Sequence, residues 1–599
     1  MANKPCMQYF SLNSRNTLML LYSLLLAVHI FFYPKWRETG TETTISWDVS
    51  GYYMYLPAIF IYHDLEQVAF LDSISKTYQP AGDDYQAFQI GNGNRVMKYT
   101  MGQAIMYSPF FFLGHAWALA DNRFPADGFS KPYQVAISLS SLVFALIGLW
   151  YLRKLLLLFF ADKAVAWSLL VIVTGSNYLN YSAIDGALTH NYLFTLYVAV
   201  LWTTHQFWRS PNMHSAMLIG FWCGLAALTR PTELILIFWP VFWGLSAWDR
   251  SGIRQRFHEI IRQKKYWSGM VLTALVIGSM QLIYWRSVTG QWLFYSYEDQ
   301  GFSWLEPHII KGLFSYRSGW LVYSPAMLLC LIGFLFLLKK NRSFGISAVI
   351  YTVLFVYIAF SWDIWWYGNS LGQRAMIQLY PVLAFPLAAF FESCVWHRTW
   401  SAVLLSLFLF ITVYLNGWFT YQAHKGGLLP TGINNRQYFW RTVGRFHQDP
   451  NDIKLLDYSE VYRGSMEQAD LILDTSETSQ WNSGPIVLLQ DDTVTNEWML
   501  AVPSDNPDWM RIYFRATVPY REPDIWKQDQ LLIRYHVQGR MDHQESIRIQ
   551  RLMQENTWPL YMDVQFNRYQ ADSIGVMFKH NLSVYPLTID SILIYSIHE

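Results

Sequence analysis

Long apolar runs alternate with short polar segments over residues 1–421 of the chain. A helix needs roughly 20 apolar residues to cross a bilayer, and eleven runs reach or approach that length. They lie at 17–34, 132–152, 164–181, 190–208, 214–229, 232–248, 266–286, 324–338, 344–361, 375–393 and 400–421. The pattern therefore predicts an all-α polytopic membrane body of about eleven transmembrane helices over 1–421.

Segment 102–120 is also apolar enough to span, but it contains Pro109. Proline removes a helical hydrogen bond, and a further crossing would upset the order of inner and outer loops. We expect this segment to lie at the outer interface, within a long outer loop, 35–131, that carries interfacial helices.

The pattern changes beyond about residue 430 to that of a soluble domain. In 509–520, Met510, Ile512 and Phe514 alternate with polar or aromatic positions, which is typical of a half-buried strand. Similar runs follow at 530–538, 546–552, 559–566, 573–580 and 589–597. We predict a more helical connector over 422–470 and a β-sandwich over 471–599.

Basic residues are concentrated in alternate short loops, and this sets the predicted orientation. With the N-terminus in the cytoplasm, the inner loops hold most of the Lys and Arg. The first run lacks a small-residue cleavage site behind it, so we interpret it as a retained helix. The prediction is an integral protein of the bacterial inner (plasma) membrane with 35–131 and the C-terminal domain on the periplasmic side.

Composition supports membrane insertion and excludes one class of partner. Of 599 residues, 53% are hydrophobic and only 15% are charged, with a formal net charge of +1. A soluble chain carries roughly 25% charged residues. The near-neutral balance argues against nucleic-acid binding through a basic face, and four cysteines provide no zinc spacing or disulfide framework.

One carboxylate stands just beyond the first predicted span. Asp48 lies in Ser46-Trp47-Asp48-Val49-Ser50-Gly51-Tyr52-Tyr53-Met54-Tyr55-Leu56-Pro57-Ala58, ahead of an aromatic-rich amphipathic stretch. A carboxylate held there reaches the lipid headgroup layer. The alternative is that Asp48 only caps the helix that follows.

Two later motifs occur in an order that resembles a known family. They are Gly224-Leu225-Ala226-Ala227-Leu228-Thr229-Arg230-Pro231-Thr232 and Trp365-Trp366-Tyr367-Gly368-Asn369-Ser370-Leu371-Gly372-Gln373-Arg374. Together with Asp48 and the interfacial helix, they resemble the GT-C glycosyltransferases. Protein O-mannosyltransferases and the aminoarabinose transferase of lipid A are the most similar members. The resemblance covers roughly 15–420 and leaves out the C-terminal domain.

The resemblance implies a membrane glycosyltransferase (a hexosyl or pentosyl transferase) that uses a polyprenyl-phosphate-linked sugar. The acceptor would be a glycolipid, a polysaccharide or a protein hydroxyl, and the anomeric carbon would be inverted. Asp48 stands where the family keeps its catalytic carboxylate. A carboxylate there can accept the acceptor's proton. A phosphate leaving group needs no general acid, in contrast to the two carboxylates of glycosidases.

A leaving phosphate does need positive charge. Arg230 and Arg374 each border a predicted span at the outer face, and their guanidinium groups match phosphate oxygens. Arg317 and Lys98 are weaker candidates for donor-phosphate binding. The alternative is that these interfacial cations contact only membrane-lipid headgroups.

Further polar groups in the outer loops are candidates for acceptor or sugar binding. Because members of the family often carry a second acidic residue in this outer loop, the resemblance implies that Asp185 orients the acceptor or, with His190, holds a divalent metal. The alternative is that Asp185 caps a helix. In the aromatic loop 287–323, Glu298 and Asp299 could bond sugar hydroxyls and Trp320 could pack on a sugar ring. No cofactor is certain; a divalent metal held by Asp48, Asp185 or His190 stays open, since two or three ligands do not define a site.

Two other classes of function compete with this interpretation. A polytopic transporter or flippase of lipid-linked or sugar substrates would carry ionisable groups near the bilayer midplane, where we find only His29. A non-catalytic envelope scaffold would need fewer helices than eleven. The concentration of acids and arginines at one face favours chemistry on a lipid-presented substrate.

Overall fold

The computed structural model describes residues 13–598 with several gaps. The gaps are 82–85, 298–299, 394–398, 448, 458–460, 468, 475–484, 489–493, 503–506, 519–527, 556–558, 570 and 582–585. The chain divides into two compact units, Met1–His424 and Lys425–Glu599. Each unit has its own hydrophobic core.

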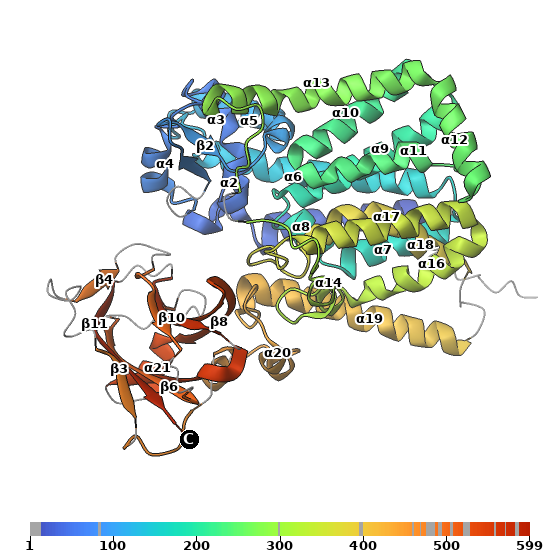
Figure 1. The fold of residues 1–599 in the computed structure, drawn as a ribbon. Coiled ribbons are helices and arrows are strands. Elements are labelled where there is room, and N and C mark those ends of the chain that lie inside the picture. Colours follow the sequence, from blue (N-terminus) through green and yellow to red (C-terminus); the bar gives the residue numbers. More distant parts are fainter. Residues whose placement is uncertain are drawn as a thin grey trace, which may run out of the picture. The chain divides into compact units, whose positions relative to one another are not determined.

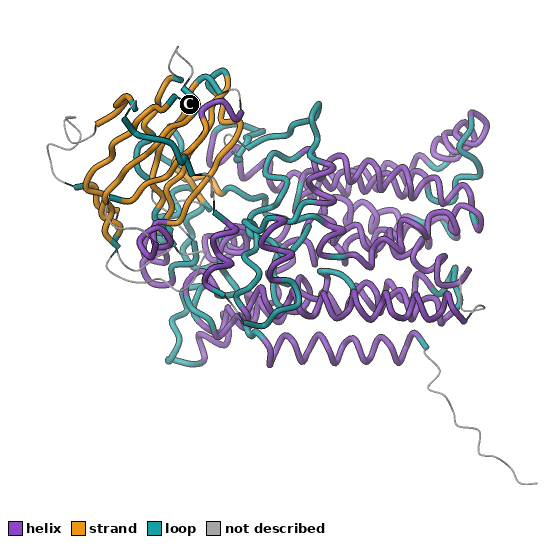
Figure 2. The backbone as a smooth tube through the Cα atoms, turned by 90° about the horizontal axis from the view of Figure 1, so that it is seen from below, coloured by secondary structure: helices purple, strands orange, loops and turns teal. Residues whose placement is uncertain are grey.

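The first unit is a helical body (Figures 1 and 2). Its α-helices are α1 (Ser14–Ala27), α2 (Trp47–Tyr53), α3 (Tyr55–Phe60), α4 (Leu71–Tyr78), α5 (Gly102–Ala120), α6 (Lys131–Leu156), α7 (Asp162–Thr174), α8 (Tyr178–Ala183), α9 (Thr189–Arg209), α10 (Met213–Thr229), α11 (Phe238–Phe242), α12 (Arg250–Arg262), α13 (Lys264–Thr289), α14 (Ile309–Phe314), α15 (Trp320–Tyr323), α16 (Leu328–Lys340), α17 (Arg342–Ser361), α18 (Tyr380–Ser393) and α19 (Thr399–Tyr421). The 3-10 helices η4 (Pro231–Ile237) and η6 (Arg374–Leu379) lead into α11 and α18. A short hairpin, β1 (Ala87–Gln89) and β2 (Arg95–Met97), lies in the outer loop.

Every apolar run predicted from the sequence contains helix, but the count of eleven spans is not confirmed. Six helical segments are long and apolar enough to cross a membrane: Ser14–Arg37, Lys131–Leu156, Lys264–Thr289, Arg342–Ser361, Arg374–Ser393 and Trp400–Gly426. The predicted run 164–181 is broken between α7 and α8, at Gly175. The run 232–248 begins at Pro231 as a 3-10 helix and yields only the short α11. These apolar helices make the first unit an integral membrane body.

Small residues let its helices approach closely. A β-carbon added at Gly220 of α10 would lie 2.1 Å from the carbonyl oxygen of Met270 in α13. Within a membrane, close packing of this kind stabilises helix pairs where hydrophobic burial from water is not available.

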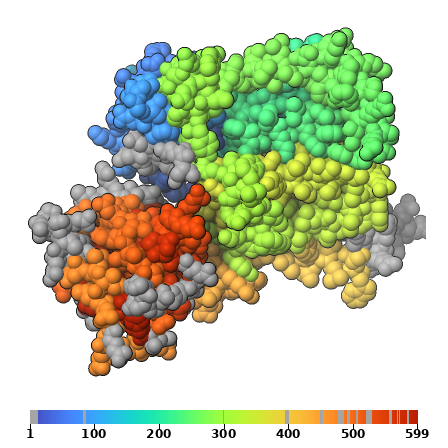
Figure 3. Space-filling model, in the orientation of Figure 1, coloured from blue at the N-terminus to red at the C-terminus, as the bar shows by residue number. Residues whose placement is uncertain are grey.

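Segment 102–120 forms a single helix, α5, with Pro109 inside it. Its first residue, Gly102, packs on the end of α10, where an added β-carbon would lie 2.4 Å from the backbone nitrogen of Thr229. The segment after α13, yellow-green in Figure 3, runs over the surface beside the outer-loop elements.

The second unit is built on two antiparallel sheets. Its strands are β3 (Asp470–Asp474), β4 (Ile486–Leu488), β5 (Trp498–Ala501), β6 (Trp509–Thr517), β7 (Gln530–Val537), β8 (Arg540–Arg548), β9 (Leu560–Gln565), β10 (Ser573–Lys579) and β11 (Leu587–Ile597). One sheet has the order β5-β10-β7-β8; in the other, β3-β11-β6-β9 are joined by β4, which pairs with β11. Both sheets contribute to one core, including the predicted inward face of β6 at Met510, Ile512 and Phe514.

Two details of this unit differ from the sequence expectation. The run 546–552 is the end of β8 followed by the helix α21 (Ile549–Glu555), not a strand. Ile549 and Leu552 are three residues apart and both buried, which is helical spacing. The predicted helical connector contains the short helices α20 (Arg436–Thr442) and η8 (Pro450–Leu456).

Candidate functional site

Asp48 lies in the first turn of α2, and both oxygens of its carboxylate are bound by side chains. Oδ1 accepts a hydrogen bond from the hydroxyl of Tyr99 at 2.8 Å, and Oδ2 accepts one from Nη2 of Arg374 at 2.7 Å. The residue before α2 is Ser46, and neither carboxylate oxygen bonds the helix backbone in the described structure. The helix-capping interpretation of Asp48 is therefore wrong.

The backbone and the packing around Asp48 hold the Tyr99 hydroxyl next to its carboxylate. Trp47 has a φ of +46°, in the left-handed region that costs a non-glycine residue roughly 1–3 kcal/mol. One turn later, a β-carbon at Gly51 would lie 2.5 Å from the ring of Tyr99, so only glycine lets that ring approach. Tyr52 then stacks on Tyr99 with ring centroids 4.3 Å apart. This packing fixes the hydroxyl that bonds Asp48.

Arg374 comes to Asp48 from the start of η6. Its side chain is 18% exposed and that of Asp48 is 19% exposed, so the ion pair lies mostly out of water. Nε of Arg374 is buried and has no hydrogen-bond partner among the described residues. The guanidinium therefore keeps a free donor next to the carboxylate.

Arg230 is the residue directly after α10, and it lacks a carboxylate partner in the described part of the chain. Its Nη1 lies 3.2 Å from Nε2 of His190, and its guanidinium carbon lies 5.5 Å from the centre of the Tyr367 ring. The hydroxyl of Thr100 donates to the carbonyl of Thr229 at 3.1 Å. This contact brings Lys98 and Tyr99 to the same end of α10.

These groups make the site electropositive. Burial tends to raise the pKa of Asp48, but Arg374, the Tyr99 hydrogen bond, Lys98 and Arg230 together hold that pKa below its usual value. Three cations thus act on one carboxylate. The excess of positive charge, with a free guanidinium donor, suits an anionic ligand such as a phosphate.

Behind Arg230, a buried chain of hydrogen bonds connects three elements. Nδ1 of His190 lies 2.8 Å from Oε1 of Gln378, whose Nε2 donates to Glu233 at 3.0 Å. The other oxygen of Glu233 accepts from the hydroxyl of Tyr197 at 2.5 Å. Sequence reasoning selected His190 but missed Gln378 and Glu233, as it missed Tyr99 and Tyr52 of the site itself. Tyr52 could have been found from its place one turn after Asp48.

Asp185 belongs to a different cluster. Its carboxylate accepts from Nζ of Lys35 at 2.7 Å and from Nδ2 of Asn180 at 3.0 Å, and His424 lies 3.8 Å away. Burial raises its pKa, but Lys35 and His424 outweigh that effect and lower the pKa to about 2. The capping interpretation of Asp185 is wrong, and the structure does not bring Asp185 and His190 together as a pair. No group of three or more His, Cys, Asp or Glu that could hold a metal is found among the described residues.

The remaining predicted residues differ in whether they lie at the Asp48 site. Lys98 is buried beside the site and acts on Asp48. Arg317 stacks on Trp366, with 3.7 Å between its guanidinium carbon and the ring centre. Trp320 is wrong as a sugar platform: it is 2% exposed and its ring nitrogen donates to Tyr380, so it packs in the core. Glu298 and Asp299 lie outside the described residues.

Comparison with known proteins gives distant structural similarities. An oligosaccharyltransferase from Archaeoglobus fulgidus is similar over 73% of this chain and 58% of its own, with a TM-score of 0.42 and 13% identity. Arabinosyltransferase EmbB from Mycobacterium smegmatis is similar over 99% of this chain and 66% of its own, with a TM-score of 0.35 and 9% identity. Both are glycosyltransferases.

The similarity is limited in two ways. The chain spans less than two thirds of the length of either enzyme, and TM-scores at this level do not transfer an activity or a residue's role. No protein-family model and no curated protein matches the sequence.

Proposed function

We propose that this protein transfers a sugar from a polyprenyl-phosphate-linked donor to a hydroxyl on the extracytoplasmic side of the membrane. The acceptor would be a glycolipid, a polysaccharide or a protein, and the anomeric carbon would be inverted. Asp48 is the proposed general base, and Arg374 and Arg230 are proposed to bind the donor phosphate, with Lys98 adding positive charge.

The single observation that supports this proposal is the composition of the Asp48 site. A carboxylate and three cations meet at one place, and one of the guanidinium groups, Arg230, has no carboxylate partner among the described residues. A phosphate can satisfy Arg230 and the free Nε of Arg374.

The transfer requires that the proton of the acceptor hydroxyl be removed and that the leaving phosphate be stabilised. The acceptor oxygen forms a bond to the anomeric carbon as the bond from that carbon to the phosphate oxygen breaks. Asp48 takes the hydroxyl proton, and the phosphate leaves with its negative charge neutralised by Arg374 and Arg230. Because a bound phosphate would compete with Asp48 for Arg374, donor binding would make Asp48 more basic at the moment when a base is needed.

Native mass spectrometry of the gently purified protein, supplied with a polyprenyl-phosphate sugar, tests the proposal. We expect the wild-type protein to retain the lipid. Arg374→Ala should lose it, because the fork of donors is gone. Asp48→Asn should retain it with the sugar still attached, since Arg374 stays available to the phosphate while the base is removed.

The matched control is Arg123→Ala, which removes an arginine of the same outer loop whose side chain is 80% exposed and pairs with Asp121. That variant should bind the donor as the wild type does. Thermal unfolding of each variant separates loss of the lipid from loss of the fold. If the wild type holds phospholipids but no polyprenyl species, or if Arg374→Ala binds the donor as well as the wild type, the donor assignment is wrong.

A further inference from the structure

The helix α12 carries a surface that the site does not use. Residues 250–265 contain six Arg or Lys and one acid, Glu259. The helix directly precedes the apolar span α13 and crosses the end of the bundle instead of running along it (Figure 1).

One side of α12 anchors it to the helical body. Arg256 is buried, with its guanidinium carbon 3.8 Å from the centre of the Trp208 ring and Nη2 donating to the carbonyl of Trp243 at 2.9 Å. A β-carbon at Gly252 would lie 2.2 Å from the carbonyl oxygen of Ala247, so the backbone touches the preceding segment. The helix is thus held in a fixed rotation about its axis.

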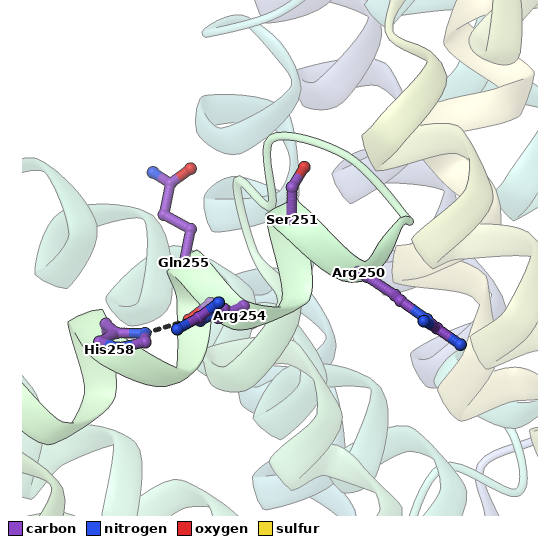
Figure 4. A pocket seen from close by; sticks show the side chains of 5 residues that line it. All are labelled: Arg250, Ser251, Arg254, Gln255 and His258. Atoms are coloured by element: carbon purple, nitrogen blue, oxygen red, sulfur yellow. Dashed lines mark hydrogen bonds between the residues drawn. The ribbon is translucent and has the colours of Figure 1, made fainter.

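That rotation leaves two further faces exposed. Ile253, Phe257 and Ile261 follow each other at four-residue intervals and are 46%, 60% and 52% exposed. Beside this apolar stripe are Arg250 and Arg254, which with Ser251, Gln255 and His258 line an open hollow on the helix surface (Figure 4). Nδ1 of His258 lies 2.7 Å from the carbonyl of Arg254, so the ring is oriented by its own helix.

α12 and the Asp48 site lie at opposite ends of α13. The last turns of α13 contact the outer loop: the Tyr284 hydroxyl accepts from the backbone nitrogen of Met97, next to Lys98, at 2.9 Å. Since α13 begins at Lys264, its first residue lies about 30 Å from the Tyr284 contact along the helix axis. If the site faces one side of the bilayer, α12 faces the other.

We propose that α12 is an interfacial helix that binds anionic phospholipids of the leaflet opposite the Asp48 site. Its apolar stripe enters the boundary between headgroups and acyl chains, and Arg250, Arg254 and Arg262 bind the lipid phosphates. Exposed apolar and basic faces side by side on a helix at the membrane surface fit such a lipid and no soluble anion, which would leave the apolar stripe in water.

The test uses the full-length protein in nanodiscs, with a bimane fluorophore on Phe257→Cys in a background free of other cysteines. The nanodiscs contain phosphatidylcholine and phosphatidylglycerol, and one or the other lipid is brominated so that it quenches the fluorophore on contact. We expect brominated phosphatidylglycerol to quench more than an equal amount of brominated phosphatidylcholine. The combined substitution Arg250→Gln, Arg254→Gln and Arg262→Gln should reduce that preference at least about fivefold.

A matched control removes the same charge from the ends of α7, α16 and α17, through Lys163→Gln, Lys339→Gln and Arg342→Gln, and should leave the preference unchanged. The proposal fails if neither lipid quenches, because α12 then does not touch the bilayer. It also fails if both lipids quench equally, or if the control substitution abolishes the preference as the α12 substitution does. Thermal unfolding confirms that each variant is folded. None of these outcomes depends on the proposed sugar transfer.

Discussion

At the scale of single residues, the site depends on a carboxylate that is kept ionised by its neighbours. The hydroxyl of Tyr99 bonds Asp48 at 2.8 Å and favours the charged form. This hydrogen bond contributes without adding charge of its own, so it can be removed with little disturbance to the rest of the site.

Tyr99→Phe should therefore move the acid limb of the pH profile to higher pH. Because the pKa of Asp48 is lowered in the free protein, kcat/KM for transfer should fall only at acidic pH, below the usual aspartate range. Loss of the hydrogen bond raises that pKa, so the fall begins at higher pH, while the rate at neutral pH changes by less than about tenfold. Transfer rates measured across pH with an added polyprenyl-phosphate sugar would show this shift. Tyr414→Phe, on an exposed ring of α19, is the control; an unshifted acid limb in Tyr99→Phe would mean that Asp48 is not the titrating base.

The glycine next to this tyrosine gives a second prediction. Gly51→Ala places a β-carbon 2.3 Å from Oε1 of Gln86 and 2.5 Å from the Tyr99 ring, so the ring must move away from Asp48. Overpacking of this kind costs roughly 1–3 kcal/mol, and we expect both a lower unfolding temperature and slower transfer. Gly278→Ala, where nothing lies within 4 Å, should leave both unchanged or slightly raise stability. Equal effects of the two substitutions would argue against tight packing at Gly51.

The sequence pattern predicted which residues belong to the site, but it did not predict which of them contact each other. Asp48 and Arg374 could be selected from the sequence because each stands next to an apolar run. Their direct ion pair could not be predicted, since it joins residues 326 positions apart. Tyr99 was missed because an aromatic residue near a membrane surface is usually part of an interfacial belt. Trp320 was selected because it lies in the aromatic loop 287–323, but its side chain is buried.

At the scale of elements, the buried hydrogen bonds from Arg230 to Glu233 connect α9, η4 and η6. Glu233 accepts from Gln378 and Tyr197 and is 2% exposed, so its removal leaves two buried donors without a partner. Glu233→Ala should destabilise the protein by roughly 1–3 kcal/mol. It should also weaken donor binding, because Gln378 holds the histidine that contacts Arg230.

The neighbouring residue provides the control. Leu234 is 64% exposed, and Leu234→Ala should change neither stability nor donor binding appreciably. Thermal unfolding measures the stability of the two variants, and native mass spectrometry measures their donor binding. If Glu233→Ala lowers stability yet binds the donor normally, the hydrogen-bond chain supports the fold without positioning Arg230.

Helices and strands could be predicted where the pattern of apolar residues in the sequence indicates a buried face. Apolar runs gave the positions of the membrane helices, and the alternation in 509–520 gave β6. Most of β8 was missed because it is an edge strand whose first five residues are exposed and, apart from Met541, polar. The breaks after α7 and at Pro231 were also not foreseen, since hydropathy is unaffected by a change in backbone direction.

At the scale of the whole molecule, the chain combines a membrane body with a β-sheet unit that has its own core. The orientation of the body decides the proposed function, because a polyprenyl-phosphate sugar presented outside the cell membrane can reach only an outward-facing site. Two exposed positions report on the two ends of α13. Gly91 lies in the outer loop next to the contacts with α13, and Ser251 lies on α12.

Gly91→Cys and Ser251→Cys, each in a background without native cysteines, should therefore react differently with a membrane-impermeant maleimide. We expect Gly91→Cys to be labelled in intact cells and Ser251→Cys only after the membrane is permeabilised. An added β-carbon at Gly91 meets nothing within 4 Å, so the substitution should not disturb the loop. The reverse pattern would place Asp48 and its arginines in the cytoplasm, where a nucleotide-linked donor could reach them. Labelling of both positions in intact cells would mean that α13 does not cross the bilayer, although its length and composition allow it to.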